Sequence, residues 1–121
     1  MEKLPDSCPP PGAGPFAYEN VYRFVNSNPA TDEDFASHQA REKKTGKKRP
    51  RSVPPCLWAT TSLWLNRDSA YEALPKLRGQ FKLLASVKIT KQCGVSILKR
   101  SHISFWRYAT FKPSVNDYES L

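Results

Sequence analysis

An apolar run rich in threonine and serine, ending abruptly at Asn66, constrains the fold of this chain more than any other feature. The run starts at Trp58 and reads WATTSLWL, and the segment NRDSAYEAL follows it, with Asp68 in the first turn of a helical pattern. A β-prone run followed by a capped helix predicts a strand-to-helix junction over residues 58–74. Such a junction gathers hydroxyl groups, the basic side chain of Arg67 and unpaired helix N–H groups. These groups suit an anion or nucleotide site, and they equally suit an ordinary turn in which Asn66 caps the helix.

Periodicity and turn residues predict the other elements. Apolar or alternating segments predict five strands, near 20–26, 57–65, 80–90, 94–99 and 102–110. Thr31 and the three acids after it predict a helix over 32–42, and a second helix starts near Asn66 and stops before Pro75. This order of strand, helix, strand, helix and three strands predicts an α+β fold, with a small mixed sheet of about five strands and two helices.

Length and composition favour one domain with a polar segment at each end. The chain has 121 residues, and five of its eleven prolines lie in residues 1–15, which we expect to be disordered or extended. We expect residues 16–112 to form the domain and residues 113–121 to form a polar tail. No apolar stretch approaches the roughly 20 residues that cross a membrane, and the N-terminal segment lacks the apolar centre of a secretory signal. We therefore expect a cytoplasmic protein that contacts no membrane.

The three cysteines are widely spaced. Cys8, Cys56 and Cys93 are odd in number, which argues against a disulfide framework. We expect Cys56 and Cys93 to behave as small buried hydrophobic residues. No close pair of cysteine or histidine residues matches the spacing of a structural zinc site, so we expect no metal.

Positive charge is concentrated in one loop. The net charge is +8, and residues 41–51, REKKTGKKRPR, hold seven basic residues against one acid, Glu42. Gly46 and three prolines predict a loop over residues 41–55. Four cations lie at its tip: Lys47, Lys48, Arg49 and Arg51. They are candidate contacts for nucleic acid or for an acidic partner protein, with strongly salt-dependent binding. The alternative is a solvated loop that aids solubility.

Short motifs along the chain resemble those of the ADP-ribosyltransferase-like fold. In that fold an early strand carries an arginine or histidine that grips a dinucleotide, a later strand carries a Ser-Thr-Ser-like motif, and a helix and an apolar strand follow. Four segments carry the resemblance: VYR at 21–23, ATTSL at 59–63, DSAYEAL at 68–74 and LLASV at 83–87. The resemblance implies that NAD is the cofactor and that four residues hold it: Tyr22, Arg23, Thr61 and Ser62.

The pattern also resembles a family of small uncharacterised bacterial proteins that share a YR, a DF-x-S and a late GHYT-like motif. The corresponding segments are YR at 22–23, DFAS at 34–37 and SH at 101–102, so the resemblance covers residues 21–110. It implies a toxin-like or effector-like protein of the toxin–antitoxin kind.

The resemblance implies glycosyl or ADP-ribosyl transfer, in which breaking the nicotinamide–ribose bond builds positive charge on the sugar. Arg23 would hold the pyrophosphate bidentately, and Ser62 would order the ribose site. The transferases also need a glutamate on a late strand to stabilise the cationic centre, and Glu119 is the one glutamate that follows Glu72. The candidate catalytic residues are therefore Glu119 and His102, whose imidazole can polarise a group. Because Glu119 lies in the polar tail, the chain departs from the family pattern here.

Other interpretations of these residues stay open. Arg23 can face solvent or pair with Asp34, and His102 can cap a strand. His38 follows Phe35 on the first predicted helix and can face the same cleft. For the whole chain, three alternatives to a transferase stay open. They are a degenerate nucleotide-binding relative, a non-enzymatic module that binds through the basic loop, and a small interaction or immunity protein that uses the aromatic strand at 103–111.

Overall fold

The computed structural model describes residues 4–77 and 79–121, which form a six-stranded sheet with short helices around it. The strands are β1 (Tyr18–Val25), β2 (Thr61–Trp64), β3 (Leu83–Ile89), β4 (Gly94–Lys99), β5 (His102–Arg107) and β6 (Val115–Ser120), in the spatial order β4-β5-β2-β1-β3-β6. The helices are α1 (His38–Thr45), α2 (Pro55–Trp58) and α3 (Arg67–Ala73), with 3-10 turns η1 (Asp32–Phe35) and η2 (Leu74–Leu77). The predicted α+β class is confirmed. The sheet has six strands rather than about five, and its pairings are antiparallel rather than mixed. β2 and β3, which α3 connects, run in the same direction, but β1 lies between them, so they do not pair with each other.

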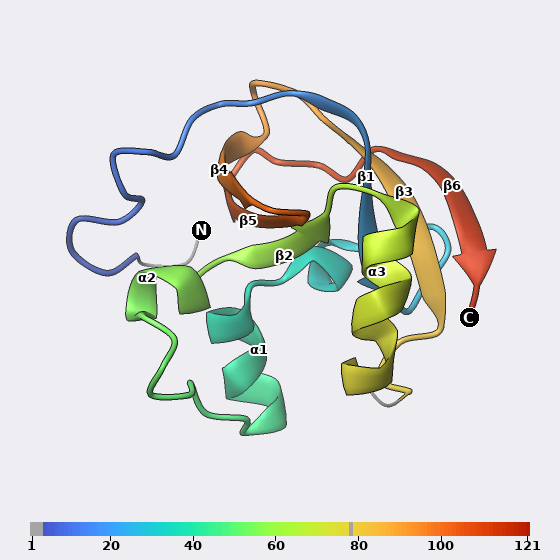
Figure 1. The fold of residues 1–121 in the computed structure, drawn as a ribbon, viewed down its shortest axis with the longest axis horizontal. Coiled ribbons are helices and arrows are strands. Elements are labelled where there is room, and N and C mark those ends of the chain that lie inside the picture. The colour runs from blue at the N-terminus through green and yellow to red at the C-terminus, as the bar shows by residue number, and fades with distance from the viewer. Residues whose placement is uncertain (1–3, 78) are drawn as a thin grey trace.

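The sheet is nearly divided between β1 and β2. β1 pairs with β3 along most of its length, whereas Tyr22 and Trp64 form the register pair that joins β1 to β2. In Figure 1, β1, β3 and β6 run together on one side, and β2, β4 and β5 run in a different direction on the other. The two halves therefore diverge beyond Tyr22, and the next residue of β1, Arg23, lies where they separate.

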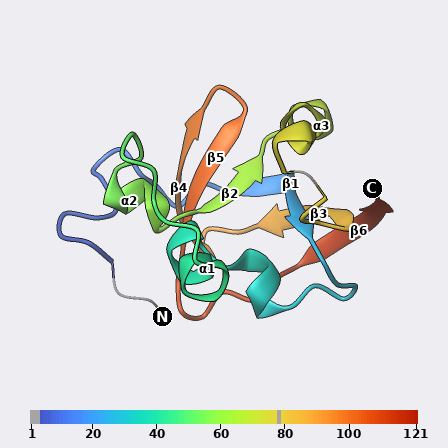
Figure 2. The same ribbon diagram turned by 90° about the horizontal axis from the view of Figure 1, so that it is seen from below.

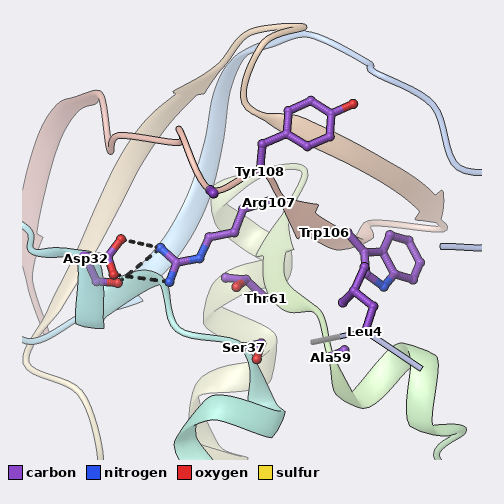
Figure 3. Close-up of a pocket in the computed structure, with 9 residues that line it drawn as sticks. Leu4, Asp32, Ser37, Ala59, Thr61, Trp106, Arg107 and Tyr108 are labelled. Carbon is purple, nitrogen blue, oxygen red and sulfur yellow. Dashed lines mark hydrogen bonds and ion pairs between the residues drawn. The ribbon is translucent and has the colours of Figure 1, made fainter. Parts of the chain in front are cut away.

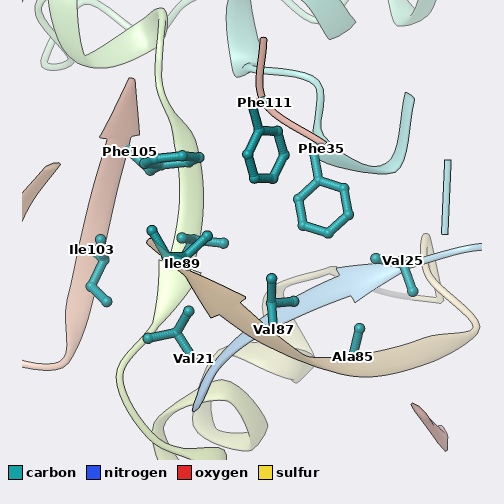
Figure 4. Close-up of a cluster of buried hydrophobic side chains, with 10 residues drawn as sticks. Val21, Val25, Phe35, Ala85, Val87, Ile89, Ile103, Phe105 and Phe111 are labelled. Atoms are coloured by element: carbon teal, nitrogen blue, oxygen red, sulfur yellow. The ribbon is translucent and has the colours of Figure 1, made fainter. Parts of the chain in front are cut away.

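One hydrophobic core connects the two halves of the sheet (Figure 4). Its buried members are Val21, Val25, Phe35, Leu63, Ala85, Val87, Ile89, Ile103, Phe105 and Phe111. The ring of Phe111 meets the rings of Phe35 and Phe105 edge-on, with centroids 5.5 Å apart in both pairs. Burying one large apolar side chain contributes about 1.5–3 kcal/mol, so this cluster supplies the main attraction between β1–β3 and β2–β5.

Helix α3 covers the other face of the sheet. Phe24, Ala70 and Leu84 form a second buried cluster there. Asn66 caps the helix by accepting a hydrogen bond from the Ser69 N–H at 2.8 Å, which confirms the predicted helix start. The α-helix ends at Ala73 and gives way to η2, as expected from Pro75.

Two predicted elements are interrupted. The helix predicted over 32–42 breaks after η1, and Ser37 starts α1 afresh by accepting from the Ala40 N–H at 3.0 Å. The first part of the strand predicted over 57–65 is instead α2, because Pro55 occupies the first helical position, where its fixed φ suits a helix.

The segment predicted as a polar tail, 113–121, contains the sixth strand. β6 pairs with β3 through partners such as Tyr118 and Ala85. Val115 and Tyr118 pack against the core while the residues between them face outward. A strand at the edge of a sheet can be polar, because one side of it faces solvent. The polar composition of this segment therefore predicted a tail where the chain forms β6.

A disulfide joins Cys8 to Cys56, so the argument against disulfides and the prediction that Cys56 is a small buried hydrophobic residue were wrong. The two cysteines are 48 residues apart in the sequence, so no short spacing between cysteines predicts that they pair. Gly14 also forms a bridge with Ser96 of β4. Residues 4–15, predicted to be disordered or extended, are thus attached to the domain at two points, and residues 1–3 lie outside the described residues. In Figure 2 this segment and α2 lie on one side of the molecule, with β3 and β6 on the other.

Within the described ranges, no helix combines the length and the apolar character needed to cross a membrane.

Tyr118 tests the contribution of β6 to the fold. Its hydroxyl accepts a hydrogen bond from the Ala30 N–H at 2.6 Å. The Tyr118→Phe variant leaves that N–H without its partner, so we expect the free energy of unfolding, measured by chemical denaturation, to fall by about 1–2 kcal/mol. Tyr108→Phe is the matched control at an exposed tyrosine and should change it by less than about 0.5 kcal/mol. Equal losses in the two variants would contradict the assignment.

Candidate functional site

Ser62 lies at the centre of a polar cluster that β2, β5 and α1 form together. Its Oγ lies 2.9 Å from Nε2 of His38 and 3.0 Å from Nε2 of His102. A serine hydroxyl has one proton to donate and lone pairs to accept with. When both bonds are made, one imidazole accepts the Ser62 proton and the other donates its own Nε2–H. The two histidines are then opposite tautomers.

Strand register brings Ser62 and His102 to the same face of the sheet. Ser62 pairs with Ser104, and Trp64 pairs with His102. Side chains two residues apart on a strand share a face, so the register places His102 diagonally next to Ser62. His38 arrives from α1, where its N–H donates to the carbonyl of Thr60 at 3.1 Å and ties the start of the helix to the entry of β2.

Two tryptophans hold the imidazole rings. The ring of His38 stacks on Trp58, with centroids 5.1 Å apart and planes 19° from parallel. The ring of His102 meets Trp64 nearly edge-on, with centroids 4.9 Å apart. Each histidine is therefore fixed by an aromatic neighbour as well as by Ser62.

Both histidines are uncharged at neutral pH. Burial lowers the pKa of His38 to about 4, with a further contribution from the positive charge of Arg23. Burial also lowers the pKa of His102. A neutral imidazole offers one lone pair and one N–H, which suits proton transfer to and from a polar ligand.

Arg23 provides a buried positive charge behind Ser62. Its side chain is 6% exposed, its Nε donates to the carbonyl of Asp34 at 3.0 Å, and its Nη1 donates to the carbonyl of Ser62 at 3.1 Å. The interaction with Asp34 that the sequence left open is thus made to its backbone. The Asp34 carboxylate accepts instead from Ser27 and from the N–H of Asn26. Burial lowers the pKa of Arg23 to about 10, so the guanidinium stays charged at neutral pH.

The structure brings three of the predicted site residues together: Arg23, Ser62 and His102. Thr61 points to the other side of β2, where its hydroxyl donates to the carbonyl of Phe35 at 2.6 Å. Tyr22 packs against the second cluster, under α3. Alternation along β2 turns Thr61 away from Ser62, whereas Tyr22, the register partner of Trp64, shares the face of Ser62 but lies toward α3.

Glu119 does not reach the Ser62 cluster. Its carboxylate accepts from Nε and Nη2 of Arg67 at 2.9 and 2.8 Å, and from the hydroxyl of Tyr71. It lies on β6, which β3 separates from β1. The predicted catalytic pair of Glu119 and His102 is therefore not assembled, and His38 is the residue that joins His102 at Ser62.

The basic loop borders an open groove of about 680 Å³. Lys48 and Arg49 of the predicted loop tip line it, together with α1, Pro55 and Trp58, whereas Lys47 and Arg51 do not. The backbone N–H of Arg49 donates to the Glu42 carboxylate at 3.0 Å, and its guanidinium donates to the carbonyl of Val53 at 2.7 Å. The loop is thereby folded back on α1.

A second cavity, of about 110 Å³, lies between the N-terminal segment, the start of α1 and the end of β5 (Figure 3). Arg107 reaches across it to Asp32, with Nη1 and Oδ1 2.6 Å apart. This cavity is much smaller than the groove and has room for ordered water molecules.

The buried histidines predict a specific pH dependence of stability. An unfolded histidine titrates near pH 6.5, whereas His38 titrates at about 4 in the folded protein, so the unfolded chain binds more protons between these values. We expect the melting temperature to fall as the pH is lowered from 7 to about 4.5, and His38→Gln to remove part of that fall.

The pKa values of Asp34 and Glu119 are lowered from ordinary values of 3.8 and 4.5, so these carboxyls add to the fall only at the lower end of this window and below it, equally in the wild type and in the histidine variants. His102→Gln serves as the comparison and should remove a further part of the fall. An unchanged slope in both variants would show that the histidines are not held neutral.

The chain matches no protein-family model, no curated protein and no solved structure.

Proposed function

We propose that this chain binds a nucleotide such as NAD at the Ser62 cluster, in the manner of the ADP-ribosyltransferase-like fold. One observation carries the proposal: Arg23, Ser62 and His102 come from three different strands and meet within hydrogen-bonding distance. The order of elements also agrees with the resemblance, since β1 carries the arginine, β2 carries the serine, and α3 and the apolar β3 follow.

The chemistry of the cluster suits a nucleotide. The charge of Arg23 has backbone carbonyls as its hydrogen-bond partners, so its field favours an anion near Ser62. The Ser62 hydroxyl and the neutral imidazoles can exchange hydrogen bonds with ribose hydroxyls. Trp58 and Trp64 offer aromatic surfaces beside the two histidines for a base or a nicotinamide ring.

Arg23 acts in this proposal through its charge rather than as a bidentate phosphate clamp. Two of its N–H donors are given to the carbonyls of Asp34 and Ser62. The groups that touch the nucleotide are then the hydroxyl of Ser62 and the imidazoles of His38 and His102. A ligand reaches them from the groove at Trp58, because this ring contacts both the groove and His38.

Glycosyl or ADP-ribosyl transfer is the activity that such a site would carry in a toxin-like or effector-like protein. A neutral histidine beside Ser62 can accept a proton from the attacking group. Stabilisation of the cationic ribose is the missing part, since Glu119 is bound to Arg67 and Tyr71. Nucleotide binding is therefore the function proposed first, and transfer is secondary to it.

Calorimetric titration with NAD tests the proposal. We expect binding heat for the wild type and an affinity at least tenfold lower for Ser62→Ala and His102→Gln, because each removes a polar contact to the ligand. Ser120→Ala, at an exposed serine of β6, is the matched control and should bind like the wild type.

Arg23→Ala should also abolish binding, provided that its circular dichroism spectrum shows a folded protein. No heat for the wild type, or equal heat for the wild type and Ser62→Ala, would refute the proposal.

A further inference from the structure

We propose that the groove between α1, the basic loop and α2 binds single-stranded nucleic acid and leads the strand to the Ser62 cluster. Binding of nucleic acid in the groove is argued from the residues of the groove itself. A second role for the bound nucleic acid, as the substrate that accepts the transferred group at Ser62, rests on the proposed function.

The groove is wide and basic. It encloses about 680 Å³, and Lys43, Lys48 and Arg49 line it against one acid, Glu42. Glu42 accepts a hydrogen bond from the backbone N–H of Arg49, so this carboxylate is held within the loop, and the lining keeps an excess of positive charge. Three cations on one concave surface suit the phosphates of a polyanion.

The cations sit on an ordered surface. Gln39 and Lys43 are four residues apart on α1 and therefore share the face that turns to the groove. The guanidinium of Arg49 is held by the carbonyl of Val53 at 2.7 Å. Because the loop is already folded back on α1, a ligand does not have to order it on binding.

Trp58 gives the groove an aromatic ring on which a base can stack, which a surface of cations alone does not offer. Its ring lines the groove and stacks on His38, whose Nε2 lies 2.9 Å from Ser62 Oγ. The disulfide at Cys56 and the hydrogen bond from Trp106 Nε1 to the Cys56 carbonyl at 3.0 Å hold α2 in place. An aromatic ring on a fixed helix, beside phosphate-binding cations, is the combination that binds unpaired bases.

These features favour a single strand over other polyanions. An acidic protein segment would satisfy the cations and leave the indole without a stacking partner. A duplex keeps its bases stacked on one another and presents its phosphates alone. A single strand satisfies both the cations and Trp58.

Fluorescence anisotropy with a labelled single-stranded RNA of about 12 nucleotides tests the proposal on the full chain with its disulfide intact. We expect the affinity to fall roughly tenfold or more between about 50 and about 200 mM salt. The double variant Lys48→Gln/Arg49→Gln should bind at least tenfold more weakly. Trp58→Ala should lose at least fivefold, while Trp58→Phe, which keeps an aromatic ring, should retain most of the affinity.

The matched control is Lys91→Gln/Lys112→Gln, which removes the same charge at exposed lysines outside the groove. An equal loss in this control would overturn the proposal, because binding would then follow net charge alone. Equal affinity for a duplex of the same length, or binding of polyglutamate in place of RNA, would also overturn it.

A calorimetric titration of Lys48→Gln/Arg49→Gln with NAD separates the groove from the nucleotide site. Unchanged NAD binding together with lost RNA binding is the expected result. If the chain binds RNA but not NAD, the groove remains a nucleic-acid site. The bound RNA is then no longer assigned as the substrate that accepts the transferred group.

Discussion

The hydrogen bonds of Arg23 connect two halves of a sheet that barely pair with each other. Beyond Tyr22 and Trp64, β1 and β2 diverge, and the carbonyl of Ser62 has no strand partner on the β1 side. Arg23 donates to that carbonyl and to the carbonyl of Asp34, so one side chain replaces the missing backbone ladder. Burying a charge is costly, and its placement here has a second effect, because burial lowers the pKa of His38 and the same guanidinium lowers it further. Arg23 therefore contributes to two features at once: the connection between the halves, together with the hydrophobic core, and the neutral state of His38, together with its burial.

The groove and the Ser62 cluster depend on two breaks in the chain's regular structure. The first is the interruption at Ser37, which starts α1 afresh and places His38 at its first position. The second is the helical turn at Pro55, which carries Trp58 under the ring of His38. A continuous helix over 32–42 and a continuous strand over 57–65 would have placed neither ring beside Ser62.

The sequence predicted the helix cap and the strands that are determined by residues close together in the chain. The cap at Asn66 and the strands around Leu84 and Phe105 follow from residues within a few positions of one another. Arg23, Ser62 and His102 were also identified, although only through a resemblance that places them on separate strands. The edge strand β6, the Cys8–Cys56 disulfide and the role of His38 depend on partners distant in the chain. Their residues carry no local pattern of their own, which is why the sequence predicted a polar tail and no disulfide, and gave His38 a place in the cleft only as one alternative.

The opposite tautomers at Ser62 make the cluster a two-way path for a proton. One imidazole takes the hydroxyl proton at Nε2 and releases its Nδ1 proton, while the other gives its Nε2 proton to Ser62 and gains one at Nδ1. All three groups are neutral before and after this exchange. One end of the path lies beside Trp58 at the groove, and the other lies beside Trp64 within the sheet. This exchange carries a proton between the Nδ1 atoms of His38 and His102 along one face of the sheet, and neither buried ring is charged before or after it.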